Sequence, residues 1–240
     1  MGEDAFDVLI LVGRPASGKS EIIDFLAHAP LDERRQEFHV AELDVLDDFP
    51  MLWTWFEEDH ILAERFGQPR LHTDAEGYFK YPYLWHLLIE RLDLEYHKRL
   101  RDDPAYHDCV TTLIEFSRGG EHGGYAGALP HLSDGLLHRA GVVYVRVSFE
   151  ESLLKNRRRF NTDRPDSILE HGLSDEKLER LYRDDDWDAF SGGEGSGFLT
   201  VKGIRVPFVV LENEGNLENV VDANKLADLL GNLWGKHTSR

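Results

Sequence analysis

Residues 8–20 read Val-Leu-Ile-Leu-Val-Gly-Arg-Pro-Ala-Ser-Gly-Lys-Ser, and this stretch decides the fold. The apolar, β-branched run over 8–12 predicts a buried strand, and the amphipathic pattern from Glu21 onward predicts a helix. Between the two lies the spacing G-x-x-x-x-G-K-S, formed by Gly13, Gly18, Lys19 and Ser20. A strand, a glycine loop and a helix in this order predict an α/β fold that binds phosphate at the start of the helix.

The glycine loop has the chemistry of a triphosphate site. Its glycines let backbone N–H groups turn toward one point, where the helix N-terminus adds partial positive charge. We expect Lys19 to bridge the β- and γ-phosphates of ATP and the Ser20 hydroxyl to ligate Mg²⁺. An ordinary glycine turn before a helix is the alternative, and the completeness of the motif argues against it. The expected nucleotide-binding residues are Gly13, Arg14, Pro15, Ala16, Ser17, Gly18, Lys19 and Ser20.

Length and composition limit the class of protein. With 240 residues, 41% hydrophobic and 30% charged, the chain can bury one substantial core, so we expect a single domain over 1–240. A net charge of −18 argues against nucleic acid or an anionic membrane as a partner. The single cysteine, Cys109, excludes an internal disulfide and is expected to be a buried, inert thiol, which favours a cytoplasmic location.

Four further segments have the composition of strands. They are residues 38–43, 110–114, 142–149 and 206–211. Because helical patterns separate them, we expect a three-layer α/β sandwich with five parallel strands in the order 2-3-1-4-5. The stretch 49–108 is too long for a simple crossover and predicts a helical insertion on the substrate side. A helical pair that merely covers the sheet is an equal alternative. The polar, turn-rich stretch 157–197 predicts a lid.

Acidic residues at strand ends are candidates for metal and acceptor chemistry. Glu115 closes the strand predicted over 110–114, where an acid can hold Mg²⁺ together with Ser20 or accept a proton. Asp44 ends the strand predicted over 38–43 and could act as the general base for an acceptor hydroxyl. A carboxylate without catalytic role remains the alternative for Glu115, and a turn cap remains the alternative for Asp44.

Basic residues are informative because the chain is acidic overall. Arg118 precedes two glycines beyond the strand over 110–114, so it is expected to bind phosphate, with a surface ion pair as the alternative. His122, in the same glycine-rich loop, is expected to be solvated. Cations on a closing lid stabilise charge during phosphoryl transfer, and Arg158 and Arg164 are our candidates for this role. They belong to the densest basic cluster, which contains Lys155, Arg157, Arg158, Arg159 and Arg164. Basic residues that complement a helix dipole are the alternative for this cluster.

The chain resembles the nucleoside and nucleotide kinase branch of the P-loop kinases, which includes adenylate kinase and shikimate kinase. The loop over 13–20 carries most of this resemblance, and Glu-Phe-Ser-Arg at 115–118 is similar to the acid-then-arginine strand end of the family. Arg-Asp-Asp-Asp at 183–186 is similar to adenylate kinase lids, and 209–218 is similar to the segment that flanks adenine. The resemblance implies an ATP-dependent kinase that uses Mg²⁺ and acts on a small molecule.

Three functions therefore remain open. The first is transfer of the γ-phosphoryl group of Mg-ATP to a nucleoside, nucleotide or other metabolite. The second is a regulatory ATP-binding protein whose lid and insertion engage a protein partner. The third, a kinase of nucleic-acid ends, is opposed by the net charge of −18. A GTPase is disfavoured because the sequence lacks an Asn-Lys-x-Asp motif.

Overall fold

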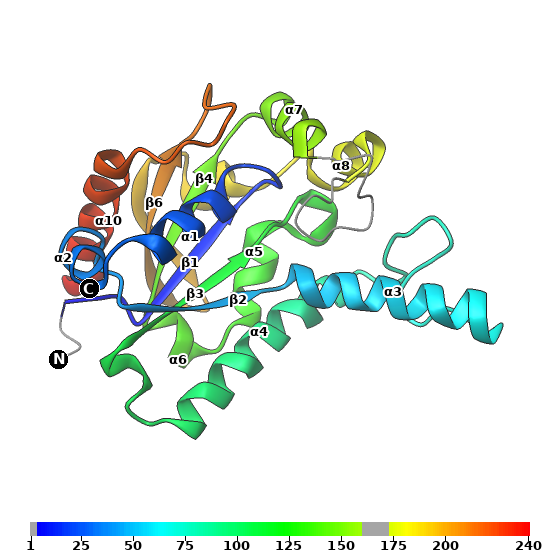
Figure 1. The fold of residues 1–240 in the computed structure, drawn as a ribbon, viewed down its shortest axis with the longest axis horizontal. Helices are drawn as coiled ribbons and strands as arrows, with labels where there is room; N and C mark the ends of the chain where they lie inside the picture. Colours follow the sequence, from blue (N-terminus) through cyan, green and yellow to red (C-terminus); the bar gives the residue numbers. More distant parts are fainter. Residues whose placement is uncertain (1–3, 160–172) are drawn as a thin grey trace.

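The structure, a computed structural model, describes residues 4–159 and 173–240, and a twisted sheet forms its centre (Figure 1). The strands are β1 (Val8–Gly13), β2 (Glu42–Asp47), β3 (Val110–Phe116), β4 (Ala140–Arg146), β5 (Ser196–Val201) and β6 (Ile204–Glu212). Their order is β2-β3-β1-β4-β6-β5, with β5 antiparallel to β6 and every other pair parallel. The expected α/β fold is confirmed, and the expected strand order holds for the five parallel strands.

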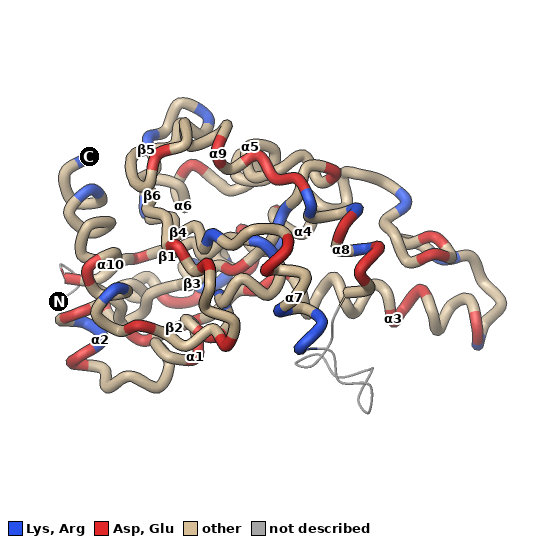
Figure 2. The backbone as a smooth tube through the Cα atoms, turned by 90° about the horizontal axis from the view of Figure 1, so that it is seen from above, with Lys and Arg blue, Asp and Glu red and all other residues tan. Residues whose placement is uncertain are grey.

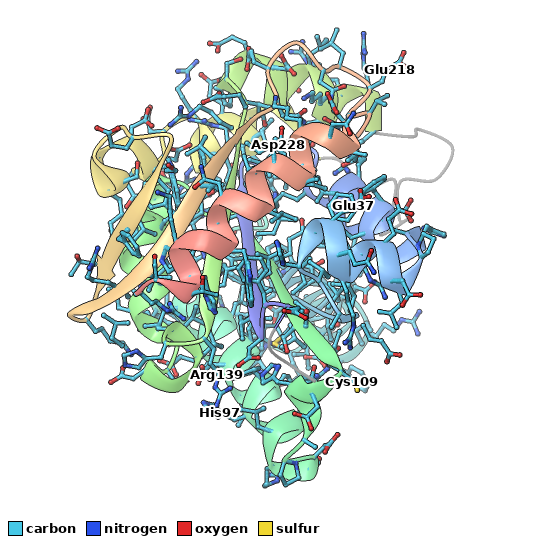
Figure 3. The ribbon with its side chains drawn as sticks, turned by 90° about the vertical axis from the view of Figure 1, so that its left-hand side faces the viewer. Glu37, His97, Cys109, Arg139, Glu218 and Asp228 are labelled. Carbon is cyan, nitrogen blue, oxygen red and sulfur yellow. The ribbon has the colours of Figure 1, made fainter. Side chains whose placement is uncertain are left out.

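Helices cover both faces of the sheet. They are α1 (Lys19–His28), α2 (Leu31–Phe38), α3 (Phe49–Phe66), α4 (Tyr83–Asp102), α5 (Gly124–Ala128), α6 (Asp134–Leu137), α7 (Phe149–Arg159), α8 (Asp175–Tyr182), α9 (Trp187–Ser191) and α10 (Ala223–Thr238). Side chains of β1 alternate between two cores: Leu9 and Leu11 pack with α1, α2 and α10, whereas Ile10 and Val12 pack with α4, α5 and α9. Figure 3 shows α10 crossing the first of these faces beside α1 and α2. The result is the three-layer architecture that buries parallel strands on both sides.

The second strand lies four residues later than the sequence pattern predicted. Phe38 is the last residue of α2 and is fully buried, and β2 begins at Glu42. Because β2 is an edge strand with an exposed Val45, its sequence alternates only weakly between apolar and polar residues. The residues before it alternate more clearly, because Phe38 and Val40 pack into the core. The consequence is functional, because the carboxyl end of β2 is Asp47 and not Asp44.

The loop expected over 191–197 instead ends in β5, a sixth strand that sequence analysis missed. A two-residue turn joins β5 to β6, and both of its residues, Lys202 and Gly203, have positive φ values of 50° and 83°. Positive φ at both central positions is typical of a type I′ hairpin turn, for which Gly is favoured. That turn was the signal for β5, because only four of its residues, Phe198 to Val201, have the composition of a strand and they follow a glycine-rich stretch.

The stretch 49–108 contains two helices with different surroundings. Helix α4 packs on the sheet through Ile89 and Leu92, whereas α3 extends away from the end of β2 (Figure 1). Asp59 is the one buried residue of α3, and its carboxylate accepts N–H groups of Leu71 and Thr73 at 2.6 Å each, which ties the following loop to the helix. None of the described helices combines the length and apolar character that a membrane crossing requires.

Cys109 corrects a further expectation. Its side chain is exposed, at the surface just before β3 (Figure 3), and not buried as its position at the start of an apolar run indicated. The short 3₁₀ helix Tyr106–Asp108 precedes it and turns the chain outward before the strand begins.

Candidate nucleotide-binding site

The glycine loop has the close packing and backbone conformation of an anion-binding turn. Gly18 has φ 109° and Ala16 has φ 56°, and a Cβ at Gly13 would lie 2.5 Å from the carbonyl oxygen of Val145. No side chain caps α1 at Gly18, so side chains leave the amides of its first turn available to an anion. The Ser17 hydroxyl is buried and has no hydrogen-bond partner among the described residues, which also suits a ligand at this loop.

Lys19 lies at the centre of the loop and is 5% exposed. Its ammonium donates to the carbonyl oxygens of Gly13 at 3.2 Å and Arg14 at 2.9 Å and to the Ser117 hydroxyl at 3.0 Å. The carboxylate of Glu115 is 3.8 Å away. Burial lowers the pKa of Lys19, and the charge of Glu115 opposes this effect. The ammonium is therefore held between β1 and β3, beside the first-turn amides.

Two carboxylates end neighbouring strands next to Lys19. Asp47 of β2 is in register with Glu115 of β3. Burial, reinforced by the charge of Glu115, raises the pKa of Asp47 to about 7. Burial also raises the pKa of Glu115, although the charge of Lys19 acts against it. A cation bound between these two carboxylates would offset the repulsion between their negative charges.

The donor set fits Mg²⁺ bound together with a triphosphate. The described residues contain no group of three or more His, Cys, Asp or Glu side chains arranged to hold a metal ion by themselves. Mg²⁺ commonly takes one or two protein oxygens and completes its shell with water and phosphate. The exposed Ser20 at the start of α1 and the Glu115 carboxylate would supply the protein oxygens here.

Asp44 does not reach this site. Its carboxylate accepts a hydrogen bond from the Tyr106 hydroxyl at 2.6 Å and pairs with Arg99 of α4. It lies in the middle of β2, and its contact with α4 is the ion pair with Arg99. The expectation that Asp44 ends the strand is therefore wrong, and the strand end is occupied by Asp47, which was not among the predicted site residues.

Arg118 is buried, with 1% of its surface exposed, and is held inside the protein. Its guanidinium pairs with Asp48 at 2.7 Å and donates to the carbonyl oxygen of Trp85 at 3.0 Å. It also lies over the rings of Trp85 and Phe116, 5.4 and 5.3 Å from their centroids. These contacts correct the expectation of a phosphate-binding arginine, because Asp48 already neutralises the charge. Its partner, 70 positions earlier in the chain, could not be recognised from the local pattern.

His122 is also buried and not solvated as expected. Its ring stacks on Trp85 at 3.8 Å, and its Nδ1 accepts the N–H of Gly119 at 3.1 Å. Burial, with a smaller contribution from the charge of Arg118, lowers the pKa of His122 to about 2. The imidazole is therefore neutral in the folded protein at any ordinary pH.

The protonation of His122 predicts an acid-sensitive fold. The unfolded chain binds a proton near pH 6.5 and the folded chain does not, so the stability that this residue supports is present above pH 6.5 and is lost as pH falls. Between pH 6.5 and 4.5 we expect a loss of about 2 to 3 kcal/mol in unfolding free energy. Urea titrations at pH 6.5 and pH 4.5 measure this loss, which should be present in the parent and absent in His122→Leu. A variant of the exposed His28 should lose as much unfolding free energy as the parent over this pH range. An equal loss in His122→Leu would contradict the prediction.

The basic cluster is largely paired. Arg157 pairs with Asp175, and Arg159 pairs with Glu21 of α1 at 2.8 Å. Lys155 is buried in an ion pair, Arg158 is exposed, and Arg164 lies outside the described residues. Figure 2 shows basic positions at the end of α7. The charge of Arg159 acts on both Lys19 and Glu115, so it is the described member of the cluster that most directly faces the phosphate site.

The segment 183–186 is anchored to the body of the protein. Arg14 of the glycine loop donates to the carbonyl oxygens of Tyr182 at 3.2 Å and Arg183 at 3.1 Å, and it pairs with Asp185 at 2.9 Å. Asp186 accepts two N–H groups of α5 at 2.7 and 2.9 Å. The Arg14 guanidinium thus satisfies carbonyls at the C-terminal end of α8, and it connects the phosphate site to that helix.

A cavity of about 250 Å³ opens beside the loop, on the side of α10. It lies between Gly18 and Ile22 on one side and the segment 211–222 on the other. Asn213 donates to the carbonyl oxygen of Ser17 at 2.7 Å and so fixes this segment to the glycine loop. The cavity shares Gly18 with the glycine loop, so it is our candidate place for the base of a nucleotide. We refer to it below as the base cavity.

No protein-family model matches the chain, and neither does any curated protein. Among solved structures, the chain is similar to Kti12 of Chaetomium thermophilum, crystallised in complex with ADP-AlF3, with a TM-score of 0.50 and 13% identity over 95% of this chain and 97% of that one. It is also similar to APE1195, with a TM-score of 0.40 and 16% identity over 98% and 97% of the two chains. The likeness to Kti12 is one of fold, and it extends over nearly the whole of both chains.

Proposed function

We propose that the chain is a phosphotransferase that binds Mg-ATP and moves its γ-phosphoryl group to a hydroxyl of a small molecule. The observation that carries this proposal is the meeting of Lys19, Glu115 and Asp47 at one edge of the sheet, next to an uncapped helix N-terminus. The base cavity supports a nucleotide, as does the likeness to a protein crystallised with ADP-AlF3. Residues 49–108 then form the acceptor side. Of the lid expected over 157–197, α9 and residues 196–197 belong to the body of the protein instead, because Trp187 is buried in the core and β5 begins at Ser196.

Each residue has a role in the proposed transfer. Lys19 binds oxygens of the β- and γ-phosphates. Ser20 and Glu115 would hold Mg²⁺, which would supply further positive charge to these phosphates. Asp47 takes the proton of the acceptor hydroxyl as its oxygen bonds to the γ-phosphorus. The bond between that phosphorus and the β–γ bridging oxygen breaks, and ADP leaves.

Asp47→Asn tests the proposal. We expect acceptor-dependent ADP release to fall by a factor of about 100 or more, the usual contribution of a general base, while the dissociation constant of Mg-ATP changes little. Asp44→Asn is the matched control, because Asp44 is on the same strand but pairs with Arg99, and it should keep its turnover. Equal turnover in Asp47→Asn and the parent, or no turnover of the parent with any acceptor, would contradict the proposal.

A nucleotide-dependent regulatory protein is the second candidate. It is favoured by exposed apolar side chains at and beyond the far end of α3, where Phe66 is 66% and Leu71 is 63% exposed. Such residues suit a protein contact better than solvent. Under this alternative the parent would convert ATP to ADP with water as the acceptor, and no labelled phosphoryl group would pass to a small molecule.

A further inference from the structure

A second cavity, of about 390 Å³, lies between α3 and α4. One of its walls is a single face of α3, on which Met51, Trp55 and Glu58 follow at helical spacing, and Arg91 of α4 also lines it. Asp47 lines the cavity too, and its carboxylate interacts electrostatically with Lys19 and Glu115. Asp47 therefore joins this cavity, which we call the α3–α4 cavity, to the phosphate site.

The charges in the α3–α4 cavity do not suit an anion. Asp47 and Glu58 are two carboxylates, and within 4–159 and 173–240 neither makes an ion pair. One guanidinium, that of Arg91, faces them, with Glu95 at 4.0 Å as its nearest acid. Figure 2 shows further acidic positions along α3. A phosphorylated acceptor would need several free cations, and Arg118 is already neutralised by Asp48.

The tryptophan in the wall of the cavity favours a cationic ligand. Trp55 is half-buried, and the ring of His72 stacks on it at 4.7 Å with the planes only 5° apart, which holds the indole in place. An ammonium near an indole face gains a cation–π attraction, and a carboxylate such as Glu58 adds a charge-assisted hydrogen bond. Met51 supplies further apolar surface for the carbon skeleton of the ligand.

We propose that the α3–α4 cavity binds the phosphoryl acceptor, and that this acceptor is a cationic alcohol, a small molecule with a protonated amine as well as the reacting hydroxyl. The inference rests on the proposed function. Glu58 and Trp55 bind the ammonium, and Asp47 binds the hydroxyl and takes its proton as the oxygen bonds to the γ-phosphorus of ATP and ADP departs. The apolar part of the acceptor packs on Met51.

Matched probes test the charge preference. We would titrate the full chain, saturated with an Mg-ATP analogue, with 6-aminohexan-1-ol against hexane-1,6-diol, and with glucosamine against glucose and glucose 6-phosphate. The six-carbon probes are chosen because Glu58 lies nine residues beyond the first residue of α3, so the ammonium and the hydroxyl must be well separated. The amine of each set is expected to bind about tenfold more tightly than its neutral counterpart, which corresponds to one charge-assisted hydrogen bond. Glu58→Gln should abolish this preference. Glu57→Gln, at the next position of α3 but outside the cavity lining, should keep it.

The outcomes separate the inference from the function on which it rests. Equal binding of amine and neutral probes, or a preference that survives in Glu58→Gln, overturns the inference. Phosphoryl transfer to glucose 6-phosphate in preference to glucosamine also overturns it, although the proposed phosphotransferase function would stand. Labelled transfer to the amino alcohols with a raised KM and an unchanged kcat in Glu58→Gln supports both. If no acceptor of any charge receives the label, the proposed function fails instead, whatever the probes bind.

Discussion

Lys19→Ala is expected to weaken the binding of Mg-ATP about 100-fold, while the protein stays folded. The lost ammonium would otherwise contact the β- and γ-phosphates, and a hydrogen bond between two charged groups contributes about 1.5–3 kcal/mol, more where solvent is excluded. Lys19 is only 5% exposed and lies beside the uncapped start of α1. We therefore expect its contribution to the binding free energy to lie at the upper end of this range. Isothermal titration calorimetry with Mg-ATP measures the effect directly.

A control and a second readout make this result decisive. Lys202→Ala removes a lysine of the β5–β6 turn, far from the glycine loop in the sheet order, and should bind Mg-ATP as the parent does. Mg-ATP at 100 times its dissociation constant should stabilise the parent by about 2.7 kcal/mol and Lys19→Ala by much less. A natively folded Lys19→Ala protein with the parent's affinity would show that the glycine loop is no nucleotide site.

The parts of the fold that sequence analysis predicted well are those that local pattern determines. The strand, glycine loop and helix over 8–28 follow each other without a break, and each part has its own signal. Strands buried on both faces, such as β4 and β6, are continuous apolar runs and were recognised for that reason. Edge strands lack this signal: β2 was predicted four residues early and β5 was missed, because each is paired on one side only.

The site was harder to predict than the fold, because charge pairing joins residues that are distant in sequence. Lys19 and Glu115 were recognised, since each occupies a defined place in a motif or at a strand end. Asp47 was missed because the error in β2 moved the strand end to Asp44. The environment of Arg118 could not be foreseen at all. Its partner Asp48 lies just before the insertion over 49–108, whereas its aromatic neighbour Trp85 lies within it.

Arg118→Ala is expected to destabilise the fold by about 3–5 kcal/mol, because it leaves the carboxylate of Asp48 buried without a cation. The substitution also removes the contacts of the guanidinium with the rings of Trp85 and Phe116 and its bond to a backbone carbonyl. A loss of this size is a large fraction of the 5–15 kcal/mol by which a typical domain is stable. The midpoint and slope of urea unfolding, followed by circular dichroism, measure it.

Two further variants distinguish a buried structural pair from a phosphate contact. Arg99→Ala breaks the half-exposed pair with Asp44 and should cost only about 1 kcal/mol, since solvent screens the remaining charge. The double variant Arg118→Met with Asp48→Asn removes both buried charges together and should recover much of the stability lost in Arg118→Ala, because no unpaired carboxylate remains. If Arg118→Ala instead unfolds like the parent but binds Mg-ATP far more weakly, the guanidinium serves the nucleotide and the pair with Asp48 is secondary. The geometry predicts that Arg118→Ala lowers the free energy of unfolding and that the folded fraction keeps its affinity for Mg-ATP.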